Sequence, residues 1–84
     1  MEAIEIKMDE ENYIDLKNKK SLITNMEADV IIKNEYLIIE FNGNNIVKKT
    51  FDNTLILASK LGYRFLGITG GIFEISFTFI KETI

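Results

Sequence analysis

The glutamates at positions 40 and 74 are the pair of side chains in this sequence that could do acid–base chemistry. Each is the only acidic residue inside a strongly apolar run, YLIIEF for Glu40 and IFEISFTF for Glu74. Two carboxylates can cleave a glycosidic bond, because one protonates the leaving group while the other activates water or attacks the sugar. Alternatively, a strand with one solvent-exposed face places single polar residues among apolar ones. We favour this second interpretation and predict no catalytic residues.

The other usual catalytic and metal-binding residue types are missing. The chain has no histidine and no cysteine among its 84 residues. Nucleophile–base catalysis normally uses one or both of these residues, and the common zinc sites are built from them. The carboxylates show no calcium-loop spacing. We therefore expect a protein that is not an enzyme and that uses no metal and no cofactor.

Acidic residues crowd the first fifteen positions, where Lys7 is the only basic residue. Such a patch could imitate the phosphates of a nucleic acid and occupy a basic groove on a partner protein. The predicted partner-binding residues are Glu10, Glu11 and Asp15. A solubilising hairpin tip is the alternative, and it is the more common role of a charge run.

Basic residues gather in the second half of the chain and form a second candidate site for a small anionic ligand, such as a signalling nucleotide. Arg64 is the only arginine, and its guanidinium is the only group here that can clamp a phosphate with two parallel hydrogen bonds. The adjacent Tyr63 offers a ring for stacking. A scattered basic edge that balances the acidic N-terminal segment is the alternative. The residues of this candidate site are Lys48, Lys49, Lys60, Tyr63 and Arg64.

A pair of glycines, Gly70 and Gly71, separates two runs rich in β-branched and aromatic residues. Glycine readily adopts the positive φ that two-residue type I′ and II′ hairpin turns require. The pair therefore predicts a two-residue turn between strands at residues 63–69 and 72–81, with Phe73 on the same face as Phe77. A loop that cradles a ligand is the alternative.

The remaining elements follow from hydrophobic alternation and turn residues. A helix through residues 13–26 is the alternative to the second strand, and we favour the strand. A short helix at about residues 53–61 is predicted from an N-cap at Asp52 or Asn53 and from Gly62 at its end. The predicted strands are residues 2–8, 13–16, 28–33, 36–41 and 46–51, with turns at 9–12, 34–35 and 42–45.

These elements predict one α+β domain over residues 1–84, with an antiparallel sheet of five or six strands and one helix packed on one face. The strand at residues 36–41 is apolar on both faces, with Leu37 and Ile39 on one and Tyr36 and Ile38 on the other. One short helix cannot cover both faces, and a large uncovered apolar surface usually marks an interface. We expect a symmetric homodimer with this strand at or under the interface.

The C-terminal third, FDNTLILASKLGYRFLGITGGIFEISFTFIKE, resembles the end of small bacterial and phage domains of the DUF4177 type, whose function is unknown. In that family a short helix runs into a leucine–x–glycine–aromatic junction and then into two antiparallel strands. The family usually has tryptophan where this chain has Tyr63. The resemblance implies a helix packed on an antiparallel sheet and no particular activity. The matching residues are Leu61, Gly62, Tyr63, Leu66, Phe79 and Lys81.

The net charge of −3 argues against a nucleic-acid binder, which needs a basic face to displace counterions. No apolar run reaches the length of a membrane span, and the first residues lack the pattern of a signal peptide. We therefore expect a cytoplasmic protein. Together with its length and its isoleucine-, lysine- and asparagine-rich, AT-biased composition, this predicts a phage or mobile-element protein that binds and inhibits a host defence protein. An oligomeric protein that sequesters a small anionic ligand is the alternative.

Overall fold

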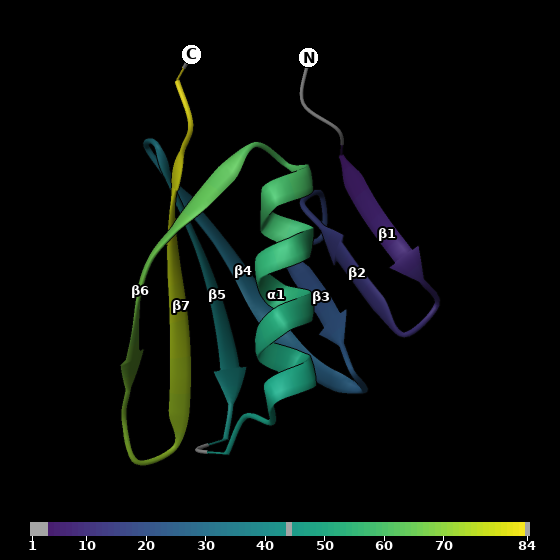
Figure 1. Ribbon diagram of the computed structural model, residues 1–84, viewed down its shortest axis with the longest axis vertical. Helices are drawn as coiled ribbons and strands as arrows, with labels where there is room; N and C mark the ends of the chain where they lie inside the picture. The colour runs from purple at the N-terminus through teal and green to yellow at the C-terminus, as the bar shows by residue number, and fades with distance from the viewer. Residues whose placement is uncertain (1–3, 44, 84) are drawn as a thin grey trace.

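The computed structural model describes residues 4–43 and 45–83, and these form one antiparallel sheet of seven strands with one helix (Figure 1). The α+β prediction is confirmed, but the predicted count of five or six strands is wrong. Residues 2 and 3 of the first predicted strand, and Asn44 of the predicted turn at 42–45, lie outside the described residues. The elements are β1 (Glu5–Asp9), β2 (Asn12–Asp15), β3 (Lys20–Ile23), β4 (Met26–Lys33), β5 (Tyr36–Asn42), α1 (Lys48–Lys60), β6 (Tyr63–Gly70) and β7 (Glu74–Lys81).

The strands follow one another across the sheet as a meander until the helix interrupts them. The order is β1-β2-β3-β4-β5-β7-β6, so the last two strands are exchanged relative to the chain. After β5 the chain forms α1, reaches the far edge as β6, and returns between β5 and β6 as β7. β6 is consequently an edge strand, and among the described strands it pairs with β7 alone.

The predicted strand at residues 13–16 is confirmed as β2, and the alternative helix through residues 13–26 is wrong, because strands and turns occupy this segment. β2 pairs with β3 through Ile14 opposite Ser21. Strand β3 was not predicted because its four residues, KSLI, are too few to show a period. Turn residues define its ends, since Lys19, Thr24 and Asn25 all have positive φ. Two successive positive-φ residues, here Thr24 and Asn25, are typical of the tight turn that joins two antiparallel strands.

The helix begins at Lys48, so the predicted strand at residues 46–51 and the predicted N-cap at Asp52 or Asn53 are wrong. Val47 occupies the N-cap position without a side-chain hydrogen bond. The sequence IVKKTF allowed the strand interpretation because its branched and aromatic residues favour β structure. Tertiary packing selects the helix, because side chains at helical spacing are buried against the sheet. These buried helical residues are Thr50, Asn53, Thr54, Leu57 and Ala58.

The predicted end of the helix is confirmed. Gly62 has a φ of 89°, in the left-handed region that glycine adopts without a steric penalty. Its N–H donates a hydrogen bond of 3.0 Å to the carbonyl of Ser59. The chain can therefore turn sharply and enter β6.

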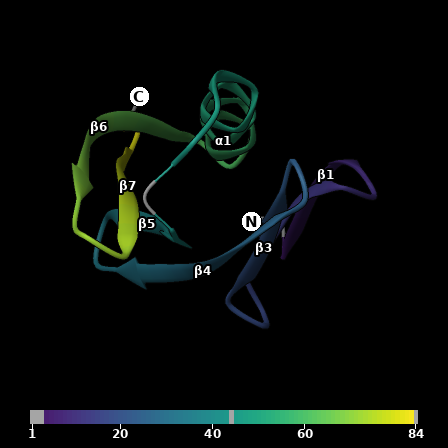
Figure 2. The same ribbon diagram turned by 90° about the horizontal axis from the view of Figure 1, so that it is seen from below.

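The core lies between the helix and the concave face of the sheet, which curves around α1 in Figure 2. Aromatic rings fill its centre, and the rings of Phe41 and Phe77 meet edge to face at 5.7 Å. Of the two apolar faces of β5, the one that carries Leu37 and Ile39 is buried, whereas Tyr36 on the other is exposed. The buried apolar residues are Ile14, Ile23, Ala28, Val30, Leu37, Ile39, Phe41, Leu57, Ala58, Leu61, Tyr63, Phe77 and Phe79.

The loop between β6 and β7 differs from the predicted glycine turn. Gly70 ends β6, and the loop consists of residues 71–73. Of the described glycines, only Gly43 and Gly62 have positive φ, so neither Gly70 nor Gly71 uses the freedom that suggested the turn. The N–H of Gly71 donates a 2.8 Å hydrogen bond to the carbonyl of Glu74 and closes the loop. Strand β7 therefore starts two residues later than predicted, and Phe73 lies in the loop.

Candidate functional site

The predicted acidic site is divided in the structure. Glu10 and Glu11 are exposed in the turn between β1 and β2, whereas Asp15 ends β2 opposite Glu5. Strand β2 therefore separates Asp15 from the turn by roughly 10 Å at 3.3 Å per residue. Asn18 donates two hydrogen bonds to the carboxylate of Asp15, and both lower the pKa of Asp15. The bond from the side-chain amide has the larger effect, and the bond from the N–H has the next largest. Asp15 thus acts locally on the β2–β3 turn, and its predicted role in binding a partner stays a prediction.

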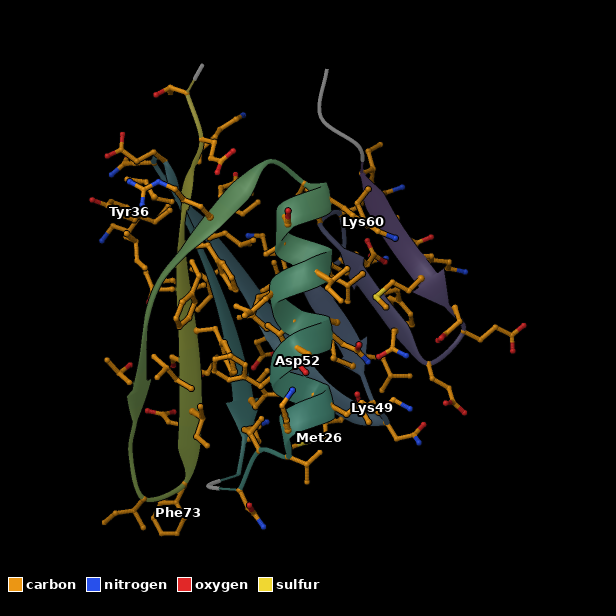
Figure 3. All side chains as sticks on the ribbon, viewed as in Figure 1. Met26, Tyr36, Lys49, Asp52, Lys60 and Phe73 are labelled. Carbon is orange, nitrogen blue, oxygen red and sulfur yellow. The ribbon has the colours of Figure 1, made fainter. Side chains whose placement is uncertain are left out.

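The predicted basic site is also divided. Lys48 and Lys49 begin the helix and Lys60 ends it, about 18 Å away at 1.5 Å per residue (Figure 3). Lys48 forms an ion pair of 2.7 Å with Asp52 on the next turn. The lysines at the two ends of α1 cannot surround one small ligand.

Tyr63 and Arg64 complete the predicted basic site but lie on opposite faces of β6. Tyr63 is only 4% exposed and belongs to the core, so its ring is not available for stacking. Arg64 lies opposite Ile80 on β7, on the sheet face that points away from the helix. The structure therefore does not bring the guanidinium and the helix lysines together.

Glu40 and Glu74 lie on neighbouring strands of the outer sheet face. Glu40 is level with Ser76 and Glu74 with Asn42, so the two glutamates are diagonal neighbours across β5 and β7. The hydroxyl of Ser76 donates a 3.4 Å hydrogen bond to Glu40. This face is convex (Figure 2), so its shape does not enclose a substrate or exclude water. The arrangement favours the interpretation that both residues mark a solvated face.

Apolar side chains are exposed along β6 and at the tip of its hairpin, and sequence reasoning missed this surface. Ile72 is 76% exposed and Phe73 is 81% exposed in the loop, and Phe73 projects from the end of the molecule in Figure 3. The signal was the apolar pair directly after the glycines, which the sequence pattern places in a strand with Phe73 on the same face as Phe77. We call this surface the β6 surface and define it as Phe65, Leu66, Ile68, Ile72 and Phe73.

The two edges of the sheet differ in their chemistry. β1 has five residues, and three of them, Glu5, Lys7 and Asp9, are charged. β6 has eight residues, of which only Arg64 is charged. Charges and short length protect an edge strand from pairing with another chain, and a long apolar edge lacks this protection. A bulge between Phe65 and Gly67 interrupts the register and leaves residues 67–70 as the segment best suited to accept an additional strand.

Residues 4–43 and 45–83 are the part of the chain that the structure describes. In this part of the chain no three histidine, cysteine, aspartate or glutamate residues are grouped closely enough to hold a metal ion. No helix formed by these residues has the length and apolar character to cross a bilayer. The β6 surface holds five of the twelve large apolar side chains that are exposed among the described residues.

Comparison with known proteins adds no family to these observations. No family model matches the chain, and no curated protein or solved structure is significantly similar to it. The resemblance of the C-terminal third to domains of the DUF4177 type therefore stays a prediction.

Proposed function

We propose that this chain is a small non-catalytic protein that acts by binding another protein through the β6 surface. The partner would contribute an extended segment that pairs with the free edge of β6, a common mode of peptide recognition. Side chains of the partner would at the same time cover Ile72 and Phe73. The absence of histidine and cysteine from the sequence supports the non-catalytic part of the proposal.

The exposure of Ile72 and Phe73 is the observation that carries this proposal. Both are large apolar side chains held in solvent by a three-residue loop, beside an edge strand with a single charge. Burial of such a side chain against a partner contributes about 1.5–3 kcal/mol. Large apolar side chains clustered in this way commonly mark an interface.

We further propose that the bound protein is a host protein and that binding inhibits it, as phage and mobile-element inhibitors of host defence do. The short acidic chain and its AT-biased composition support this role by analogy. The β1–β2 turn, which carries Glu10 and Glu11, lies on the opposite side of the molecule from the β6–β7 loop (Figure 1). They would therefore lie outside this interface and would affect only the rate of encounter, through the long-range electrostatic field of the protein.

The alternative, capture of a small anionic ligand, is less well supported because its residues are dispersed. Lys48 and Lys60 are at opposite ends of α1, and Tyr63 is buried. A nucleotide-sized ligand could contact only part of this set. We therefore retain protein binding as the proposed function.

Capture from a host bacterial lysate tests the proposal when two double variants are compared. The tip variant, Ile72→Ser with Phe73→Ser, replaces the two exposed apolar side chains of the β6–β7 loop. The control variant, Val47→Ser with Ile56→Ser, replaces two apolar side chains that are also exposed but lie elsewhere. We expect one host protein to be retained by the wild type and by the control variant, and to be lost with the tip variant. Equal retention by the tip variant, or recovery of a nucleotide in place of a protein, would reject the proposal.

A further inference from the structure

We propose that a second copy of this chain packs against the outer face of the sheet, with the twofold axis along the row formed by Ile31, Ile38 and Thr78. This inference does not depend on the proposed function, because it uses the face of the sheet and leaves the β6 surface free. The pattern of charge on the outer face is self-complementary, and for this reason we identify the partner as a second copy of the chain.

Strand register places the outer-face side chains in three parallel rows. Lys33 is level with Tyr36, which is level with Ile80, and Ile80 with Arg64. The middle row is Ile31, Ile38, Thr78 and Gly67, which lies two residues further along β4, β5 and β7 and three further along β6, where the bulge adds one. Two residues further on, the third row consists of Asp29, Glu40, Ser76 and Thr69.

The three rows differ in charge. The first row contains two cations, Lys33 and Arg64, and the third contains two anions, Asp29 and Glu40. The middle row is uncharged, and Ile31 in it is 40% exposed. The helix packs on the other face, so no described element covers these rows.

A twofold axis along the middle row would bring the first row of one copy over the third row of the other. Such an axis keeps each strand over its own counterpart and reverses the direction along the strand. Lys33 of one copy then faces Asp29 of the other, and the hydroxyl of Tyr36 faces the carboxylate of Glu40. Each of these contacts occurs twice, as in any interface in which both subunits use the same patch.

The middle row would pack on itself. Ile38 lies near the axis and would meet Ile38 of the second copy, and Gly67 would let the two backbones approach. Sheets that pack face to face keep their strands within about 30° of one another, which preserves this matching of rows. The existing ion pair of Lys20 with Asp29, at 3.3 Å, is exposed to solvent, so it leaves Asp29 able to accept a second cation.

Sedimentation equilibrium of the full chain tests the location of the interface. We expect the wild type to form a dimer and Ile38→Asp to form a monomer, because the substitution would place two carboxylates together at the axis. Ile56→Asp is the matched control on the exposed side of the helix, and it should remain a dimer. A monomeric wild type, or a dimer that survives Ile38→Asp, would overturn the proposal.

A mixing experiment tests the orientation of the two copies and uses surface residues, so the fold is preserved. Lys33→Glu alone would place like charges opposite each other, and so would Asp29→Lys alone. Each variant should raise the dissociation constant at least about tenfold, since like charges held opposite each other at an interface repel. An equimolar mixture of the two variants should recover dimers, because both contacts in a mixed pair join opposite charges. A mixture that dissociates as readily as each variant alone would overturn the proposed axis.

Discussion

The side chain of Asn53 in α1 donates a hydrogen bond of 3.0 Å to the side-chain oxygen of Asn12 in β2, although 41 positions separate them. The same oxygen accepts a 2.9 Å bond from the N–H of Thr24, and the amide of Asn12 donates to Asp9 at 3.0 Å. Asn12 therefore joins the helix to the β1–β2 and β3–β4 turns. Both asparagines are buried, so these hydrogen bonds fix how the helix sits on the N-terminal half of the sheet.

Asn53→Ala should lower the free energy of unfolding by about 1–3 kcal/mol, because it removes two donated hydrogen bonds from a buried site. The bonds are those to Asn12 and to the hydroxyl of Thr24, the latter at 3.2 Å. Chemical denaturation measures the change. Ser59→Ala on the exposed side of the same helix is the control and should leave stability nearly unchanged. Equal stability of the two variants would show that the polar contact does not hold the helix in place.

Gly62→Ala and Gly71→Ala should have different effects on stability, because only Gly62 has a positive φ. A left-handed conformation costs a residue with a side chain about 1–2 kcal/mol, so Gly62→Ala should lower the melting temperature. At Gly71 a β-carbon would meet its nearest neighbour, the side chain of Glu74, at 3.5 Å, which is ordinary contact. Gly71→Ala should therefore melt close to the wild type. A large drop in the melting temperature of Gly71→Ala would contradict this prediction and would favour the tight glycine turn predicted from the sequence.

The carboxyl of Asp15 should titrate below its usual pKa of 3.8, because Asn18 donates hydrogen bonds to its charged form. A lowered pKa in the folded state stabilises the protein above the unfolded-state pKa, and this contribution disappears as the pH falls through the folded-state value. The contribution of Asp15 to stability therefore changes with pH only below about pH 4. Carboxyl NMR titration measures the midpoint, which Asn18→Ala should raise toward the usual value. An unchanged midpoint in that variant would contradict the assigned cause.

Local signals were sufficient for much of the fold. The strands that became β4 and β5 follow from their β-branched and aromatic composition, and the end of the helix follows from Gly62. The start of the helix could not be read in the same way, because IVKKTF carries residues that favour strands and Val47 is not a capping residue. Burial of Thr50 and Asn53 against the sheet decides that segment, and such contacts between distant residues are not visible in a local pattern.

The candidate site was harder to predict because it depends on the order of the strands. Placing β7 between β5 and β6 makes β6 an edge, and no local property of the sequence TGGIF indicates this. The charged residues of each predicted site are close together in the sequence, but they are not all close together in the structure. Lys48 and Lys60 are near in the chain but lie at opposite ends of a helix, and Asp15 is separated from Glu11 by a strand.

Titration calorimetry of the captured host protein against three forms of the chain tests the central claim, that binding runs through the β6 surface. The forms are the wild type, Phe73→Ser, and a variant with Glu10→Lys, Glu11→Lys and Asp15→Lys. We predict that Phe73→Ser raises the dissociation constant about thirtyfold, which corresponds to about 2 kcal/mol, the loss expected for one of the few residues that dominate an interface. The charge reversals should change it by less than about fivefold, as expected of exposed charges. Loss of binding with the charge reversals and unchanged affinity with Phe73→Ser would contradict the account.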